Sequence, residues 1–170
     1  MDFKKIRKST SRFLGWLGFN LCSLIIKLIP ARWLYGFANN IAHLGYIIAV
    51  KQRDIAVESL GIAFGNENNE EERRQIARGC FEFMAKSAVE LLFLIDKPRL
   101  LKKQVKLAGK ENLDAALSRG RGVILASAHF GNFPLLLARL SLEGYKVAGI
   151  MHAMRDKRME KAFLKQRNRF

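Results

Sequence analysis

The sequence predicts an α/β fold in which N-terminal membrane-associated helices precede an incomplete, parallel-type α/β layer fold. Two patterns support this prediction. Residues 1–50 contain apolar stretches flanked by basic residues, which is typical of membrane association. After residue 104, short apolar runs of strand length alternate with helix-like segments, which is the order of parallel strands joined by helices. We therefore expect a membrane-anchoring helical segment over 1–50 and the N-terminal part of an α/β domain over 51–170.

The first segment contains two apolar stretches. Basic residues precede a run over 13–26, and a second uncharged stretch covers 33–50. Each is shorter or more polar than the ~20 apolar residues that a spanning helix needs. A short span, a shallow hairpin and interfacial helices all remain open, and the alternative is a pair of buried core helices. The basic flank favours the cytoplasmic face and anionic lipid.

Two helices are expected next, over 51–64 and 70–95, with a polar break over 66–69 between them. Apolar residues in the second recur mostly every three or four positions, which is the helical period. Acidic residues at 70–72 open this helix, where carboxylates interact favourably with the helix dipole. The Asp96-Lys97-Pro98 sequence is expected to end it.

The last third is expected to alternate strands and helices. The expected strands cover 105–108, 123–128 and 145–151, and the expected helices cover 110–118, 134–142 and 155–170. A turn is expected over 119–122. Pro134 suits the first turn of its helix, where the missing N–H has no cost.

The chain is strongly basic, with 30 Lys and Arg against 15 Asp and Glu and a net charge of +15. Such a charge attracts nucleic acid, anionic lipid headgroups or an acidic carrier protein. A nucleic-acid partner is not expected, because the chain has no recognisable nucleic-acid module and its first third is apolar. Cys22 and Cys80 are expected to be reduced, buried thiols, and their spacing does not predict a metal site.

His129 is the strongest candidate for chemistry. It follows the expected strand over 123–128 and precedes a helix that starts near Phe133 and Pro134. Ligands of parallel α/β sheets collect at the carboxyl ends of strands, and a helix N-terminus stabilises negative charge. This arrangement suits acyl transfer, in which a histidine takes a hydroxyl proton and N–H groups support the oxyanion. A non-catalytic histidine at the end of a strand is the alternative.

Residues Gly122–Phe133 read Gly-Val-Ile-Leu-Ala-Ser-Ala-His-Phe-Gly-Asn-Phe. This segment resembles the lipid A biosynthesis acyltransferases, the late acyltransferases within the lysophospholipid acyltransferase superfamily. That family carries a His-Phe-Gly-Asn-aromatic sequence followed by a carboxylate. The basic end of this chain, over 166–170, is similar to the family's arginine block. The resemblance covers nearly the whole chain and is most specific over residues 129–133.

The resemblance implies a transferase that moves a fatty acyl chain from an acyl carrier protein to a hydroxyl of a lipid A-type glycolipid or a lysolipid. His129 would be the general base, Asn132 would shape the motif loop, and Arg167 would bind an anionic group, with Arg169 as the alternative. No metal or other cofactor takes part in this transfer. The implied location is the cytoplasmic face of the cell inner membrane.

Two departures from the family pattern keep a second interpretation open. Pro134 occupies the carboxylate position of the motif, and proline can neither orient nor charge-stabilise an imidazole. In a serine-protease triad the loss of the orienting carboxylate costs about 10⁴ in rate. The chain also stops at Phe170, about halfway through the family's domain. We therefore expect either an active acyltransferase or a catalytically inactive, truncated remnant or membrane-binding partner.

Overall fold

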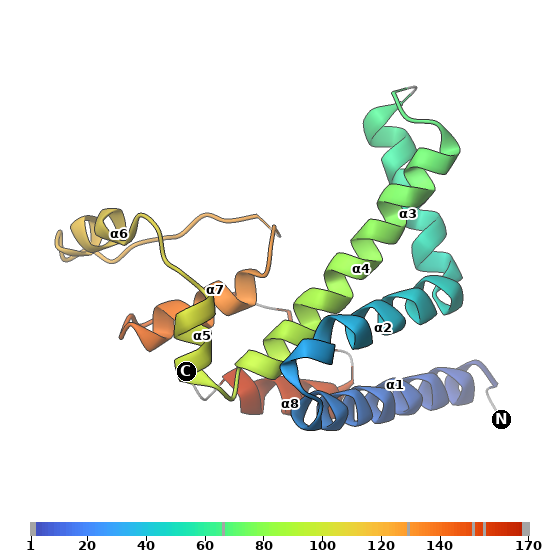
Figure 1. The fold of residues 1–170 in the computed structure, drawn as a ribbon, viewed down its shortest axis with the longest axis horizontal. Helices are drawn as coiled ribbons and strands as arrows, with labels where there is room; N and C mark the ends of the chain where they lie inside the picture. Colours follow the sequence, from blue (N-terminus) through green and yellow to red (C-terminus); the bar gives the residue numbers. More distant parts are fainter. Residues whose placement is uncertain (1–2, 66, 129, 151, 155, 168–170) are drawn as a thin grey trace. The chain divides into compact units, whose positions relative to one another are not determined.

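A computed structural model describes residues 3–65, 67–128, 130–150, 152–154 and 156–167 (Figure 1), and it gives side-chain surroundings for all of these except 3–8, 11, 163 and 165–167. Helices dominate the described part. In chain order they are α1 (Phe3–Leu28), the short 3-10 helix η1 (Ala31–Trp33), α2 (Leu34–Ile48), α3 (Val50–Phe64), α4 (Glu70–Leu94), α5 (Pro98–Gln104), α6 (Lys110–Leu117), α7 (Phe133–Leu142) and α8 (Lys157–Arg167).

The predicted α/β layer fold is wrong, because the described residues contain no strand and no sheet. The segments expected as strands at 105–108, 123–128 and 145–151 are irregular or extended as far as the structure describes them, without a ladder of hydrogen bonds between neighbouring strands; residue 151 lies outside the described residues. Their apolar side chains are also largely exposed, since Ile124 and Ile150 have relative exposures of 97% and 106%. A run of apolar residues reports the local preference for extended backbone, whereas a strand also needs a neighbour to satisfy its N–H and C=O groups.

The prediction of N-terminal membrane helices is also corrected. Within the described residues, no helix combines the length and the apolar composition that crossing a membrane requires. The physical reason lies in the helix boundaries. Helix α1 includes the basic residues that precede the apolar run, and α2 has only 15 residues, among them Asn39 and Asn40. A spanning helix needs ~20 mainly apolar residues in succession.

The helices expected from the second third onwards are confirmed to within a few residues. The expected ranges 51–64, 70–95, 110–118, 134–142 and 155–170 correspond to α3, α4, α6, α7 and α8. Helix α5 was not predicted. Pro98 was interpreted as the end of the preceding helix, but it lies in the first turn of a new one. Proline is favoured at that position because the first N–H groups of a helix have no partner within it.

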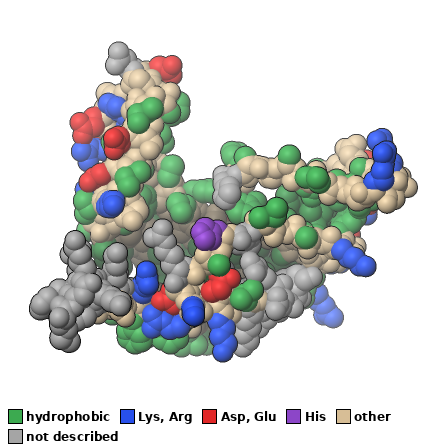
Figure 2. All heavy atoms as spheres, turned by 180° about the vertical axis from the view of Figure 1, so that it is seen from behind, with side chains coloured by type: hydrophobic (Ala, Val, Ile, Leu, Met, Phe, Trp, Pro, Cys, Tyr) green, Lys and Arg blue, Asp and Glu red, His purple; other side chains and the backbone are tan. Residues whose placement is uncertain are grey.

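The chain divides into two compact units, and the first consists of Leu24–Leu92. Helices α2, α3 and α4 contribute most of it, and their buried core includes Leu34, Ala38, Ala42, Ala77 and Val89. In Figure 2 charged side chains of both signs cover the α3–α4 hairpin, which is consistent with exposed ion pairs such as Arg74–Glu70 at 2.6 Å.

The ring of Tyr46 joins the three long helices of this unit. The ring lies edge-on to that of Phe81 on α4, with centroids 5.4 Å apart. The guanidinium of Arg53 on α3 lies 5.6 Å from the Tyr46 centroid, and that of Arg78 on α4 lies 5.1 Å from it. Two cations over one largely buried aromatic ring therefore supplement the apolar core.

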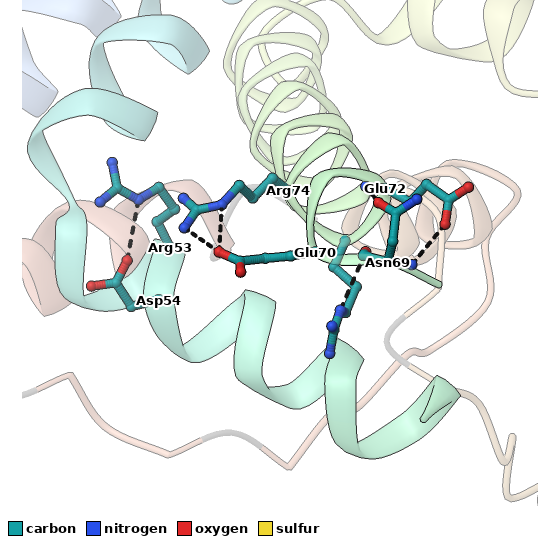
Figure 3. Close-up of polar contacts among 7 residues, drawn as sticks. Arg53, Asp54, Asn69, Glu70, Glu72 and Arg74 are labelled. Carbon is teal, nitrogen blue, oxygen red and sulfur yellow. Dashed lines mark hydrogen bonds and ion pairs between the residues drawn. The ribbon is translucent and has the colours of Figure 1, made fainter. Parts of the chain in front are cut away.

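Helix α4 begins with a capping box (Figure 3). The Glu72 backbone N–H donates to Asn69 Oδ1 at 3.0 Å, and the Asn69 N–H donates to Glu72 Oε2 at 2.8 Å. Two N–H groups without helical partners are thereby satisfied. One turn on, the Arg74 guanidinium bonds to the Glu70 carboxylate and lowers its pKa.

The substitution Asn69→Ala is expected to destabilise the protein by about 1 kcal/mol, because alanine leaves the Glu72 N–H without its cap. Urea unfolding followed by circular dichroism measures the change. Asn69→Ser should recover most of the lost stability, since a serine hydroxyl can accept the same hydrogen bond. Equal destabilisation by serine and alanine would show that the lost capping hydrogen bond is not the cause of the destabilisation.

The second unit combines Met1–Ser23 with Phe93–Phe170. Helices α5 and α7 pack against each other in it (Figure 1). The buried apolar side chains of this part come from the end of α4 and the residue after it, from α5 and from α7: Phe93, Leu94, Ile95, Leu101, Leu135, Ala138 and Leu140. Leu101 is completely buried, with 0% exposure.

Both cysteines are free thiols in the structure. Cys22 is partly buried, and burial raises the pKa of its thiol. Cys80 lies on α4 and is exposed, so the prediction that both thiols are buried is wrong for this residue. The apolar neighbours of Cys80 in sequence indicated burial, but its own position on the helix faces solvent.

Candidate active site

The His-Phe-Gly-Asn-Phe motif leads directly into α7. Gly131 has a φ of 63°, in the left-handed region that favours glycine, and it turns the chain toward the helix. Asn132 is the N-cap residue of α7, and its backbone C=O accepts from the Leu135 N–H at 3.0 Å. Before the glycine, the Phe130 N–H donates to the Ala128 C=O at 2.8 Å. The described residues of the motif, from Phe130 onwards, therefore form a tight connection that ends at a helix N-terminus.

The structure describes only part of the predicted site. Asn132 is partly buried at the start of α7. Arg167 is the last residue of α8. His129, Arg169 and the side chain of Arg167 lie outside the described residues. The roles assigned to these four residues thus remain predictions.

Pro134 lies in the first turn of α7, as the sequence predicted. The pyrrolidine ring fixes φ near the helical value and carries no N–H, which costs nothing at this position. Local structure therefore explains why proline is tolerated where the family motif has a carboxylate. Proline at this position supplies no hydrogen-bond acceptor for the N–H of an imidazole ring.

Helix α7 is fixed to α5 by a polar network as well as by its apolar face. Arg139 Nε donates to the backbone C=O of Val105 at 2.9 Å, and its guanidinium also bonds to the Glu143 carboxylate. Lys102 Nζ of α5 lies 3.4 Å from the same Glu143 Oε1. The hydrogen bond from Arg139, followed by that from Lys102, lowers the pKa of Glu143. Helix α7, which begins at the motif, is thus held against α5 by its apolar side chains and by these polar contacts.

Glu143 is one of the acidic residues that lie near His129 in sequence, as are Glu111 and Asp114. Its carboxylate is engaged by two cations at the C-terminal end of α7. Ten residues of helix separate that end from the start of the helix, a distance of about 15 Å. Glu143 therefore lies at the opposite end of α7 from position 134, where the family motif has its carboxylate.

Arg139 is a residue that sequence reasoning missed. Its side chain is only 13% exposed, which is low for arginine, and it joins α7 to the segment after α5. One signal was available in the sequence. Arg139 lies on the helix predicted over 134–142, and Glu143 follows that helix directly, four residues after Arg139, which is the spacing of a helical ion pair.

A second polar cluster ties α6 to the segment after α7. The Tyr145 hydroxyl donates to one oxygen of Asp114, and Lys110 Nζ donates to the other at 3.1 Å. These two hydrogen bonds lower the pKa of Asp114, and the bond to Asp114 raises the pKa of Tyr145. All three groups are exposed to solvent, so the cluster connects two segments rather than forming a buried catalytic site.

Helix α8 is fixed at its start. Asp156 accepts from the Arg158 guanidinium at 2.7 Å and from the Arg158 N–H at 2.9 Å, and these bonds hold the pKa of its carboxyl well below the usual range. The same guanidinium lies 5.5 Å from the ring centroid of Phe13 and 5.7 Å from that of Trp16 on α1. The helix that carries Arg167 is therefore attached to α1.

The sequence profile of the family described as bacterial lipid A biosynthesis acyltransferase matches residues 1–170. The chain belongs to this family. The match confirms the family that the motif residues indicated. No curated protein and no solved structure matched the chain.

Membership of the lipid A acyltransferase family assigns the reaction class. The members are acyltransferases of lipid A biosynthesis, so the substrates are an acyl donor and a lipid acceptor. Among the described residues, no three His, Cys, Asp or Glu side chains come together in a group that could hold a metal ion.

Proposed function

We propose that this chain moves a fatty acyl chain from an acyl carrier protein to a hydroxyl of a lipid A-type glycolipid precursor, with His129 as general base. The observation that carries the proposal is the family match over residues 1–170, which includes the His-Phe-Gly-Asn-Phe motif. The tight connection into α7 supports it, because it brings the motif to a helix N-terminus.

In the proposed reaction the His129 imidazole takes the proton of the acceptor hydroxyl. The hydroxyl oxygen then attacks the thioester carbonyl of the donor, and collapse of the tetrahedral intermediate breaks the C–S bond and releases the carrier thiolate, which takes the proton back from the His129 imidazolium. The N-terminus of α7 would stabilise the negative charge on the intermediate. Asn132 would shape the loop, and Arg167 or Arg169 would bind an anionic group of the acceptor.

The proposed location is the cytoplasmic face of the inner membrane. A lipid acceptor resides in a membrane, and an acyl carrier protein is a soluble donor, so the reaction has to take place where the two meet. The net charge of +15 would favour the anionic lipid of that surface. Recovery of the expressed chain with inner-membrane vesicles tests this location, and recovery only with the soluble fraction would contradict it.

The substitution His129→Ala is expected to lower acyl transfer at least about 10²-fold, because a general base contributes 10²–10⁴ in rate. The assay follows transfer of a labelled acyl group from acyl carrier protein to a lipid A precursor. His43→Ala is the matched control, since His43 is an exposed histidine on α2 outside the motif. Equal rates for the parent chain and His129→Ala would remove His129 as the base.

A second candidate function is favoured by Pro134. Without the motif carboxylate the chain would be a catalytically inactive remnant or a membrane-binding partner. This alternative predicts no turnover by the unaltered chain at any donor concentration. Measurable transfer that depends on His129 would rule it out.

A further inference from the structure

Helix α5 and the two residues that follow it form a concentrated basic surface. Residues 97–106 contain five Lys and Arg residues and no acidic residue. Two of the five are engaged locally: Lys97 Nζ lies 3.1 Å from the ring centroid of Phe93, and Lys102 pairs with Glu143. The remaining three, Arg99, Lys103 and Lys106, form what we call the α5 basic row.

The α5 basic row points away from the protein core. Arg99 and Lys103 are four residues apart, so they lie above each other on one side of the helix. Leu101, between them, lies about 200° around the helix from each and is completely buried. All three residues of the row are exposed, and none forms an ion pair with an acidic side chain of the described residues.

The surroundings of the row favour a soluble acidic partner over a lipid surface. Interfacial helices combine basic residues with large apolar side chains that enter the bilayer. Among the large apolar residues of the 95–116 segment, all of which the structure describes, none is exposed. The row therefore offers charge without an apolar anchor, which matches an acidic protein surface.

The row is also close to the candidate active site through the packing of the two helices. Helix α5 packs on α7, and the network of Lys102, Glu143 and Arg139 links them. Helix α7 begins at the catalytic motif. A partner bound to the outer side of α5 would thus be one helix away from the helix that carries the motif.

We infer that the α5 basic row is the docking surface for the acidic carrier protein that delivers the acyl chain. This inference rests on the proposed function for the identity of the partner. The row attracts the carrier and orients it next to α7, while the carrier's flexible pantetheine arm brings the thioester to the motif. Contacts of this kind act mainly on association and are weakened by salt.

The test measures binding directly, so that it does not depend on turnover. Holo acyl carrier protein is immobilised, and the parent chain is compared with the double variant Arg99→Glu/Lys103→Glu by surface plasmon resonance. The matched control, Arg119→Glu/Arg121→Glu, changes the net charge equally at two exposed arginines outside α5. Circular dichroism checks that all three proteins keep the same helix content.

The α5 variant is expected to bind the carrier at least tenfold more weakly at low salt, and the control is expected to bind within about threefold of the parent. Vesicles containing phosphatidylglycerol should bind both variants equally. The inference is overturned if the two variants weaken carrier binding equally, if only vesicle binding falls in the α5 variant, or if the parent chain does not bind the carrier. Selective carrier binding without acyl transfer would refute the proposed function and leave the docking surface in place.

Discussion

Replacing Pro134 by glutamate is expected to raise the rate of acyl transfer by up to about 10⁴-fold, which is the loss that follows removal of the orienting carboxylate in a serine-protease triad. The family motif has a carboxylate at this position. Position 134 lies in the first turn of α7, where a negative charge interacts favourably with the helix dipole. The helix should therefore accept glutamate and present its carboxylate near the motif.

The control for this prediction is Pro134→Gln, which has nearly the same shape as glutamate but no charge. Both variants give up the fixed φ of proline, so both are expected to lose up to about 1 kcal/mol of stability. Comparison of kcat/KM for the two variants isolates the carboxylate. If glutamine accelerates transfer as much as glutamate does, the gain does not need the negative charge, and the proposed role of the missing carboxylate is wrong.

Truncation of Leu101 to alanine is expected to destabilise the protein by about 3 kcal/mol, which combines the lost transfer free energy with the cost of a cavity. Leu101 is completely buried in the unit in which α5 packs on α7. Urea unfolding followed by tryptophan fluorescence or circular dichroism measures the loss. A large effect would show that α5, a helix of only seven residues, depends on packing rather than on its own helical preference.

Leu117→Ala provides the comparison, because Leu117 also lies on a short helix, α6, but is 36% exposed. Its truncation should cost less than about 1 kcal/mol. If both substitutions lower the free energy of unfolding by the same amount, the greater burial of Leu101 makes no contribution to stability. The packing of α5 on α7 would then not be the source of stability that we infer.

The helices could be predicted from the sequence because each carries its own signals. The expected range 70–95 agrees with α4 because its apolar residues follow the helical period and its acidic residues open it. Helix α5 was not predicted, because seven residues are too few to show a regular spacing of apolar residues. Its one strong signal, Pro98, marks either the end of one helix or the start of the next.

The strands were predicted wrongly because strand formation depends on a partner. The 123–128 run has the length and composition of a buried strand, yet Ile124 is almost fully exposed. Sequence pattern reports what a segment prefers locally, and no local rule states whether a neighbour lies within hydrogen-bonding distance. The motif itself was recognised by its resemblance to the family's His-Phe-Gly-Asn-aromatic sequence, and the positive φ of Gly131 and the N-cap position of Asn132 became visible only in the structure.

The residues that fix the candidate site were harder to foresee. Arg139 bonds to the backbone of Val105, which is 34 positions away in the chain. The cluster of Tyr145 and Asp114 joins residues 31 positions apart. Such contacts depend on how helices pack, so only the local part of each, such as the spacing of Arg139 and Glu143, can be recognised in the sequence.

The two free thiols differ in a way that chemistry can exploit. Alkylating reagents react with the thiolate, so the exposed Cys80 should be modified before Cys22, whose burial disfavours the charged form. The cysteines lie in different compact units of the chain. Modification in two stages would therefore attach one fluorophore to each unit without any engineered cysteine, and energy transfer between the dyes would report the distance between the units in solution.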